Sequence, residues 1–167
     1  TCAANDVVHV YAKTTTLFEL RIEKADGTAI VGAYTQGACP PTLVPGTSGA
    51  PTYGSQVGLY TKIGRLVTVQ WFMTGARNTM VGTLSLSGLP FASTATANMY
   101  LGIALGLWYQ VGGTTFTNMV GFLPPSSTTF NLYVQPTAAD HIQVTLWNAT
   151  DISANWQVGG SFSYMTD

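Results

Sequence analysis

Hydrophobic and polar residues alternate along much of the chain, and the pattern is clearest in YTKIGRLVTVQWFMTG, residues 60–75. Within this run one alternate set is entirely apolar: Val67, Val69, Trp71 and Met73. Successive side chains of a strand point to opposite faces, so this set predicts a buried strand face. The other set is half apolar, because Leu66 and Phe72 flank Thr68 and Gln70. A solvated strand face is expected to be polar, so something besides water should cover part of this one.

Short strands are predicted along most of the chain, with turn-forming Gly and Pro residues between them. After the first third they cover residues 57–62, 66–74, 81–86, 101–109, 130–134, 142–147 and 161–165. No window shows an apolar period of 3.6 residues, so helices are expected to be nearly absent. Many short strands with such turns are typical of an antiparallel β-sandwich or a jelly-roll-like domain. The predicted fold class is all-β.

The N-terminal part predicts a separate β-hairpin segment. Residues 17–23 alternate strictly between apolar and charged positions, and residues 7–12 form a second extended run. Asp26-Gly27 is a short-hairpin signal, with residues 29–34 as the return strand. A segment dense in Pro, Gly, Ser and Thr then predicts a linker. Three parts follow: a hairpin segment (1–36), a linker (37–55) and a C-terminal β-sandwich (56–167).

The composition excludes some classes of function. Only 8% of the residues are charged, the formal net charge is -1, and 46% are hydrophobic. A nucleic-acid groove needs clustered Lys and Arg, so no nucleic-acid partner is expected. The high hydrophobic content also argues against a disordered chain, because enough apolar surface can be buried on folding. An uncharged surface suits a protein partly covered by neighbouring subunits, and it equally suits a charge-poor extracellular β-domain.

Neither a membrane span nor a metal site is predicted. The longest apolar run covers residues 101–108, whereas about 20 residues are needed to cross a bilayer. Cys2 and Cys39 match no metal-binding or CxxC pattern. A disulfide between them is possible, and two free buried thiols are the favoured interpretation. No cofactor is expected.

The chain offers little for catalysis. It has two histidines, His9 and His141, and no nucleophile-elbow, HExxH, P-loop or dinucleotide-binding motif. Asp140-His141 reads more simply as a turn aspartate beside a surface histidine than as a catalytic dyad. The acidic residues at 19 and 23 share a strand face with an arginine, which favours a solvated charge ladder over paired catalytic carboxylates. No catalytic residue is assigned, and a non-enzymatic protein is predicted.

Aromatic residues on polar strand faces are the candidate binding residues. Trp147 is in phase with polar positions of its predicted strand, and Tyr133 shares a phase with Asn131. Such rings can stack on a sugar or pack into a subunit interface, and shielding by a loop is the alternative interpretation. Trp156, Trp108 and Tyr109 are weaker candidates for the same role.

Three runs carry a resemblance to a known family: residues 60–69 (YTKIGRLVTV), 82–91 (GTLSLSGLPF) and 159–167 (GGSFSYMTD). They resemble the C-terminal modules of bacteriophage tail fibres and tailspikes, and the likeness extends from about residue 53 to the end of the sequence. The N-terminal AANDVVHVYAKTTTLFEL is similar to the closing strands of small β-modules that precede such tips. The apolar MYLGIALGLWY departs from the family pattern.

The resemblance implies a β-sandwich or jelly-roll domain that forms a homotrimer at the distal end of a virion fibre. Such tips contact other virion proteins and bind host-surface polysaccharide or protein; some relatives sit on the capsid. The expected location is the tail fibre or capsid surface, after assembly in the host cytoplasm. No catalytic residues are carried over, because the matching motifs are structural.

The leading hypothesis is a trimeric, receptor-binding fibre tip. The first alternative is a trimerisation or capsid-decoration module without its own receptor. The second is a carbohydrate-binding accessory domain of a polysaccharide depolymerase. On any of these, Leu66 and Phe72 are predicted to meet a neighbouring subunit or a covering loop.

Overall fold

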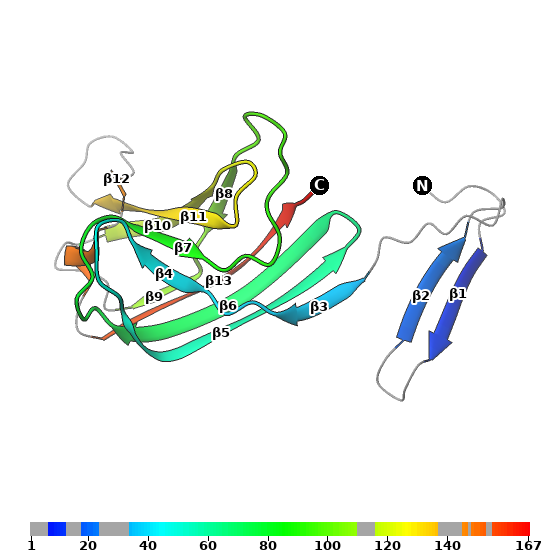
Figure 1. Cartoon of the computed structure of the whole chain (residues 1–167), viewed down its shortest axis with the longest axis horizontal. Helices are drawn as coiled ribbons and strands as arrows, with labels where there is room; N and C mark the ends of the chain where they lie inside the picture. Colours follow the sequence, from blue (N-terminus) through cyan, green and yellow to red (C-terminus); the bar gives the residue numbers. More distant parts are fainter. Residues whose placement is uncertain are drawn as a thin grey trace.

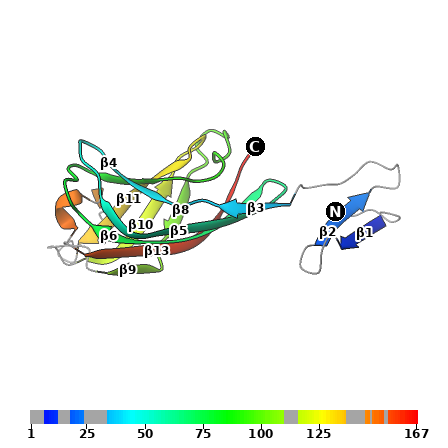
Figure 2. The same ribbon diagram turned by 60° about the horizontal axis from the view of Figure 1, so that its bottom comes forward.

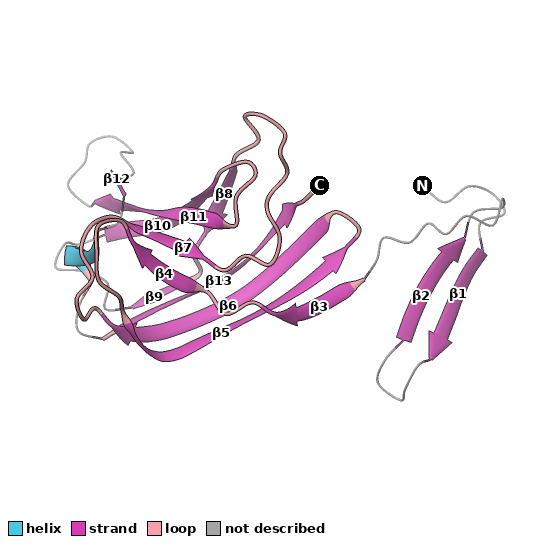
Figure 3. Cartoon of the chain, in the orientation of Figure 1, coloured by secondary structure: helices cyan, strands magenta, loops and turns pink. Residues whose placement is uncertain are grey.

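The protein is all-β, with two antiparallel sheets packed face to face as a sandwich (Figure 1). The computed structural model describes residues 7–12, 18–23, 34–109, 116–136, 145–146, 148–152 and 155–167. The helical structure in these ranges is one 3-10 turn, η1 (Ala149–Asp151), as Figure 3 shows. The predicted all-β sandwich is therefore confirmed.

The first sheet has the strand order β3-β5-β6-β13-β9 and is called the β6 sheet below. Its strands are β3 (Thr35–Ala38), β5 (Thr52–Ile63), β6 (Leu66–Ala76), β13 (Trp156–Met165) and β9 (Leu107–Tyr109). The second, called the β11 sheet, has the order β4-β7-β11-β10-β8, with β12 also paired to β11. Its strands are β4 (Thr42–Pro45), β7 (Leu84–Ser87), β11 (Thr129–Pro136), β10 (Phe116–Leu123), β8 (Leu101–Ala104) and β12 (Thr145–Leu146).

β1 (Val7–Ala12) and β2 (Phe18–Glu23) form a third, two-stranded antiparallel sheet, with Val7 opposite Glu23 and Ala12 opposite Phe18. This pair matches two of the strands predicted for the N-terminal segment. The Asp26-Gly27 turn lies outside the described residues, as does all of the proposed return strand except Tyr34, which is not in a strand.

β6 is the central strand of its sheet, with β5 paired along one edge and β13 along the other. Gly64, with φ of 59°, makes the tight turn that returns the chain from β5 to β6. β13 pairs along the other edge, from Trp156 opposite Gly75 to Met165 opposite Leu66. Figure 2 shows these long strands running together along one layer.

The core lies between the sheets and is built from the apolar alternate positions. The four residues predicted to be buried on β6 are at most 5% exposed: Val67, Val69, Trp71 and Met73. Their partners from the β11 sheet include Phe130, whose ring centre lies 6.3 Å from that of Trp71 and 5.5 Å from that of Phe162. Burial of such rings against each other supplies much of the stability of a sandwich.

Residues 37–55, predicted as a linker, contain strand structure. They include the end of β3, all of β4 and the start of β5, which pair with β5, β7 and β6 respectively. The Pro and Gly residues mark turns between short strands here, because Pro is tolerated at strand ends and edges.

The apolar run 101–109, predicted as one strand, forms two strands in different sheets. β8 pairs with β10 of the β11 sheet, and β9 pairs with β13 of the β6 sheet. Leu105 and Gly106 make the crossing, and Leu105 is buried in the core. The inward residues Ile103, Leu105 and Trp108 thus change sheets while facing one core, whereas Leu107 and Tyr109 are exposed on the outer face.

The segment between β7 and β8 is fixed to the end of the sandwich by polar contacts. The Tyr164 hydroxyl donates to the Phe91 carbonyl oxygen at 2.8 Å. A carboxylate oxygen of Asp167 accepts from the N–H of Ala95 at 2.8 Å, and the other accepts from the Thr94 hydroxyl at 2.8 Å. This segment is therefore held in one position beside β13.

Candidate binding surfaces

The outer face of the β6 sheet is uncovered and uncharged. Its outward residues on β5, β6, β13 and β9 include Val57, Leu59, Thr61, Ile63, Leu66, Thr68, Gln70, Phe72, Gly159, Ser161, Ser163, Met165, Leu107 and Tyr109. No member of this set, called the β6 face below, carries a charge. Leu59 is 61% exposed and Ile63 is 59% exposed, so large apolar side chains contact solvent there.

A shallow hollow of about 280 Å³ lies on this face, lined by Val57, Gly58, Leu59, Gln70, Trp71 and Phe72. Phe72 is partly buried, because its ring lies over the backbone of Gly159. Thr68 shares a 2.7 Å hydrogen bond with Ser163 of the next strand. Thr68 and Ser163 therefore satisfy each other if this face becomes buried, whereas the Gln70 amide has no partner among the described residues and would need one.

Leu66 and Phe72 are the residues predicted to be covered by a loop or by a neighbouring subunit. Leu66 is exposed, and the partial burial of Phe72 comes from its own sheet. At one edge of the β6 face, Leu66 and Met165 share a hollow with Met99 and Leu101. Cover by a neighbouring subunit stays a prediction.

The outer face of the β11 sheet carries three aromatic rings in contact. Tyr100 stacks on Phe122, with ring centres 4.9 Å apart and planes inclined by 19°. Tyr133 approaches Phe122 edge-on, with centres 6.2 Å apart and planes at 82°. Since one face of Tyr100 lies on Phe122 and the residue is 52% exposed, its other face is turned to solvent.

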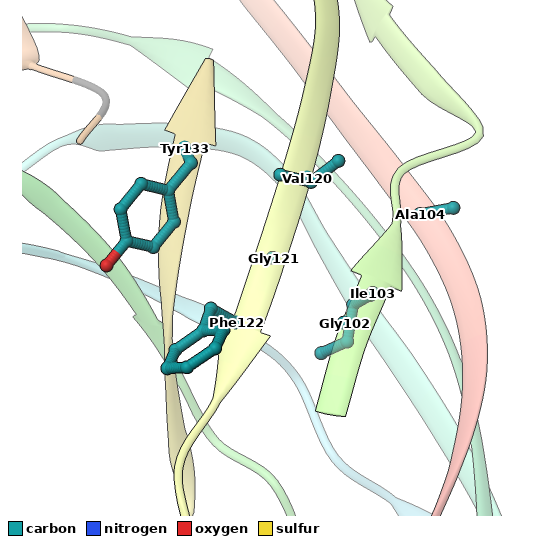
Figure 4. Close-up of a pocket in the computed structure, with 7 residues that line it drawn as sticks. All are labelled: Gly102, Ile103, Ala104, Val120, Gly121, Phe122 and Tyr133. Atoms are coloured by element: carbon teal, nitrogen blue, oxygen red, sulfur yellow. The ribbon is translucent and has the colours of Figure 1, made fainter. Parts of the chain in front are cut away.

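Beside these rings is an open apolar hollow of about 560 Å³, lined by Gly102, Ile103, Ala104, Val120, Gly121, Phe122 and Tyr133. Figure 4 shows the Phe122 and Tyr133 rings side by side on β10 and β11, next to the small residues of β8. A Cβ atom at Gly102 would meet nothing within 4 Å, so the hollow is open above this glycine. The hollow results from a glycine and an alanine placed opposite larger side chains: Gly102 pairs with Phe122, and Ala104 with Val120.

Polar side chains without a hydrogen-bond partner among the described residues lie near this hollow, and one of them, Tyr133, lines it. Asn118 and Asn131 lie on the same outer face of β10 and β11. Their amides and the Tyr133 hydroxyl have no hydrogen-bond partner among the described residues. No lining residue is charged. The hollow therefore presents apolar walls with neutral donors and acceptors at its edge.

A second hollow, of about 190 Å³, lies on the other side of Tyr100, toward the end of β13. Leu66, Met99, Leu101 and Met165 contribute most of its apolar lining. Its serine and threonine residues already have partners; for example, Ser93 donates to the Pro124 carbonyl oxygen. This hollow is smaller than the one beside Tyr133, and its lining is mainly apolar.

The five aromatic residues proposed for binding do not form one site. Tyr133 lies at the β11-sheet hollow, whereas Tyr109 is exposed on the β6 sheet. Trp108 is partly buried against the core. Trp156, one of the weaker candidates, begins β13 and is 1% exposed, so its ring fills the core and does not face solvent. Trp147 lies outside the described residues.

Sequence reasoning missed Tyr100, Phe122 and Gly102. Phe122 has the same signal that points to Tyr133, an aromatic residue in phase with a polar one, here Asn118. The signal was lost because residues 116–123 were not recognised as a strand. Tyr100 lies outside any strand, so strand phase cannot identify it.

The described residues contain no group that could hold a metal ion. No three His, Cys, Asp or Glu residues are grouped among them, and Cys39 is a free, buried thiol. Cys2 lies outside the described residues. The ion pair between Arg65 and Asp167, at 3.2 Å, belongs to the contacts that fix the chain near Ala95. No helix in the described part is long and apolar enough to span a membrane.

Comparisons with known proteins show the fold. No protein-family model and no curated protein matches the sequence. Among solved structures, the chain is similar to the crystal structure of the Dettilon tailspike protein (gp208), with a TM-score of 0.57 and 17% identity. The likeness covers 77% of this chain and 23% of that protein, so this chain spans about a quarter of its length. The fold is therefore tailspike-like.

Proposed function

We propose that this chain is a non-enzymatic structural module of a bacteriophage virion that forms a homotrimer and binds a receptor on the host surface. The observation that carries the proposal is the uncovered, uncharged β6 face, with exposed Leu59 and Ile63. The tailspike-like fold supports a place in the virion.

The size of the β6 face suits a subunit interface. β5, β6 and β13 contain 12, 11 and 10 residues. At about 3.3 Å per residue and about 4.8 Å between strands, the three long strands cover roughly 35 by 14 Å. With the short strands β3 and β9 the area is about 600 Å², which approaches the roughly 800 Å² that one partner contributes to a standard protein–protein interface.

The chemistry of the face favours a second copy of the same chain. A face without charge has no like-charge repulsion when copies of it meet, and it offers nothing to a partner selected by charge. Its serine and threonine hydroxyls can pair across strands, as Thr68 and Ser163 do. Three β6 faces packed about a three-fold axis would bury Leu59, Leu66 and Phe72 together.

A trimer would also explain how a module without a deep pocket holds a receptor. Three weak sites on one rigid assembly can raise avidity on the order of 10²–10⁴ without any new contact. The β11 sheet, on the opposite side of the sandwich, would then be free to face the host.

The assembly test is the mass of the full chain in solution, measured by light scattering after size exclusion at micromolar concentration. A trimer should show three times the mass of the 17.7 kDa chain. Leu59→Lys and Ile63→Lys should give folded monomers, because they place charges in the interface. Val44→Lys is the matched control, since Val44 is exposed on β4 of the other sheet. A monomeric wild type would overturn the assembly part.

The receptor test uses fluorescently labelled chain on a panel of bacterial strains. Adsorption to some strains and not others supports receptor binding. A folded trimer that adsorbs to none indicates instead a trimerisation or decoration module. Release of soluble polysaccharide from cells by the chain alone would contradict the non-enzymatic assignment.

A further inference from the structure

We propose that the hollow beside Phe122 and Tyr133, on the outer face of the β11 sheet, binds an uncharged hexopyranose unit of a surface glycan. The proposal rests on the receptor-binding function above and names the ligand class and its place. Three features of the hollow carry it: half-buried aromatic rings in its lining, open space, and neutral polar groups near it.

The rings supply a surface for the apolar face of a sugar. A pyranose presents several C–H groups on one side, and these weakly positive groups are attracted to the electron-rich face of an aromatic ring. Phe122 is held between Tyr100 and Tyr133 by contacts of 4.9 and 6.2 Å between ring centres. These contacts restrain the rings before a ligand arrives, which lowers the entropy lost on binding.

The open space has the size and shape for a small ligand. The volume of about 560 Å³ falls within the range of small-molecule sites. Gly102 keeps it open, because a Cβ atom added at this position would meet no other protein atom within 4 Å and a larger side chain would occupy the hollow. The space next to Phe122 therefore exists because Gly102, its partner on β8, has no side chain.

The edge of the hollow selects a neutral, hydroxyl-rich ligand. The amides of Asn118 and Asn131 and the Tyr133 hydroxyl can each donate and accept, and none has a partner among the described residues. No charged residue lines the hollow, so an acidic sugar would lose hydration without gaining an ion pair. A neutral hexopyranose fits both the apolar walls and this edge.

The structure provides matched variants for the test. Gly102→Leu fills the hollow and should leave the fold intact, since a Cβ there meets nothing within 4 Å. Gly106→Leu is the control, because a Cβ at Gly106 also meets nothing within 4 Å and the residue does not line the hollow. Phe122→Ala removes the central ring.

The full chain is applied to an array of neutral and acidic bacterial oligosaccharides, followed by saturation-transfer NMR with methyl glucoside, galactoside, mannoside and N-acetylglucosaminide. We expect binding to neutral sugars, weakened about tenfold or more by Gly102→Leu and by Phe122→Ala. Gly106→Leu should bind as the wild type does, and all variants should keep the wild-type mass.

Three results would overturn the inference: no saccharide bound by the folded wild type, binding to acidic sugars only, or binding unchanged in Gly102→Leu. An adsorption assay on bacteria distinguishes failure of the sugar-site inference from failure of the proposed receptor-binding function. If the chain adsorbs to cells but binds no sugar, the receptor is a protein and only this inference fails. If it neither adsorbs nor binds sugar, the receptor-binding function fails as well.

Discussion

Gly102 lies directly opposite Phe122 in the ladder between β8 and β10, and the preceding residue of β10, Gly121, lies opposite Ile103. A Cβ atom at Gly102 would meet nothing within 4 Å, whereas one at Gly121 would lie 2.8 Å from the ring of Phe130. Two glycines in neighbouring rungs thus have opposite tolerance for a side chain, because one faces solvent and the other faces the core.

Alanine substitutions should reveal this difference in the free energy of unfolding. Gly121→Ala is expected to destabilise the protein by about 1–3 kcal/mol, since the added methyl group overpacks the core against Phe130. Gly102→Ala should be neutral or stabilising by up to about 1 kcal/mol, through lower chain entropy in the unfolded state. Urea unfolding of the two variants measures both values. If both variants lost the same free energy of unfolding, Gly102 would not face open space.

The proposed trimer should respond weakly to ionic strength. The β6 face carries no charge, so added sodium chloride has no interfacial ion pair to screen. The dissociation constant, measured by sedimentation, should change less than about threefold between low and physiological salt. Sodium sulfate should tighten the assembly, because it strengthens apolar burial. Dissociation by moderate sodium chloride would mean that a charged surface forms the interface instead.

Acid should weaken the contacts around Asp167. The N–H of Ala95, the Thr94 hydroxyl and the Arg65 guanidinium hold the pKa of this carboxyl below its ordinary value. A group whose pKa is lowered by folding stabilises the native state above its unfolded pKa, and that contribution is lost as the pH falls below it. Asp167→Asn should therefore unfold more easily than the wild type at pH 7 and lose less stability on acidification. Thermal melts between pH 7 and pH 3 compare the two.

Alkali should destabilise the protein through Tyr164. Burial raises the pKa of this phenol to about 12, although its hydrogen bond with the Phe91 backbone acts in the other direction. Because the pKa is raised on folding, the stabilisation is complete below the unfolded pKa of about 10 and is lost as the pH rises through about 12. Tyr164→Phe should lower stability at pH 7 by about 1–2 kcal/mol, since it removes the hydrogen bonds to Phe91.

The variant tests the origin of the alkaline effect. Wild type should lose stability between about pH 10 and pH 12, while Tyr164→Phe should lose less over the same interval. If both proteins respond alike, another group is responsible for the alkaline transition.

Much of the fold follows from local alternation in the sequence. The predicted strand 66–74 lies within β6, and Val67, Val69, Trp71 and Met73 are all buried as expected. A strand with one apolar face can pack in a sandwich in only one orientation, so the pattern fixes which side is inward. The same alternation marks the second face of β6 as unusual, because Leu66 and Phe72 interrupt its polar positions.

Pairing between distant segments could not be predicted in this way. Alternation does not specify that residues 101–109 divide between two sheets, nor that β4 pairs with β7. The burial of Trp156 could not be predicted either, because NWQVGG resembles a turn, whereas the indole fills the core beside Tyr53. The hollow at Gly102 depends on which strand lies next to β10, and that neighbour is set by the complete topology.

The position of β13 has a consequence for how the chain is made. β6 ends at Ala76 and its partner β13 begins at Trp156, so roughly 80 residues must be synthesised before this edge of β6 can pair. At a translation rate of about 5–20 residues per second, the edge stays open for roughly 4–16 s. An open strand edge can pair with any other extended chain. Nascent chains on neighbouring ribosomes would then compete with β13 for β6, so the timing of synthesis sets the balance between correct folding and strand exchange.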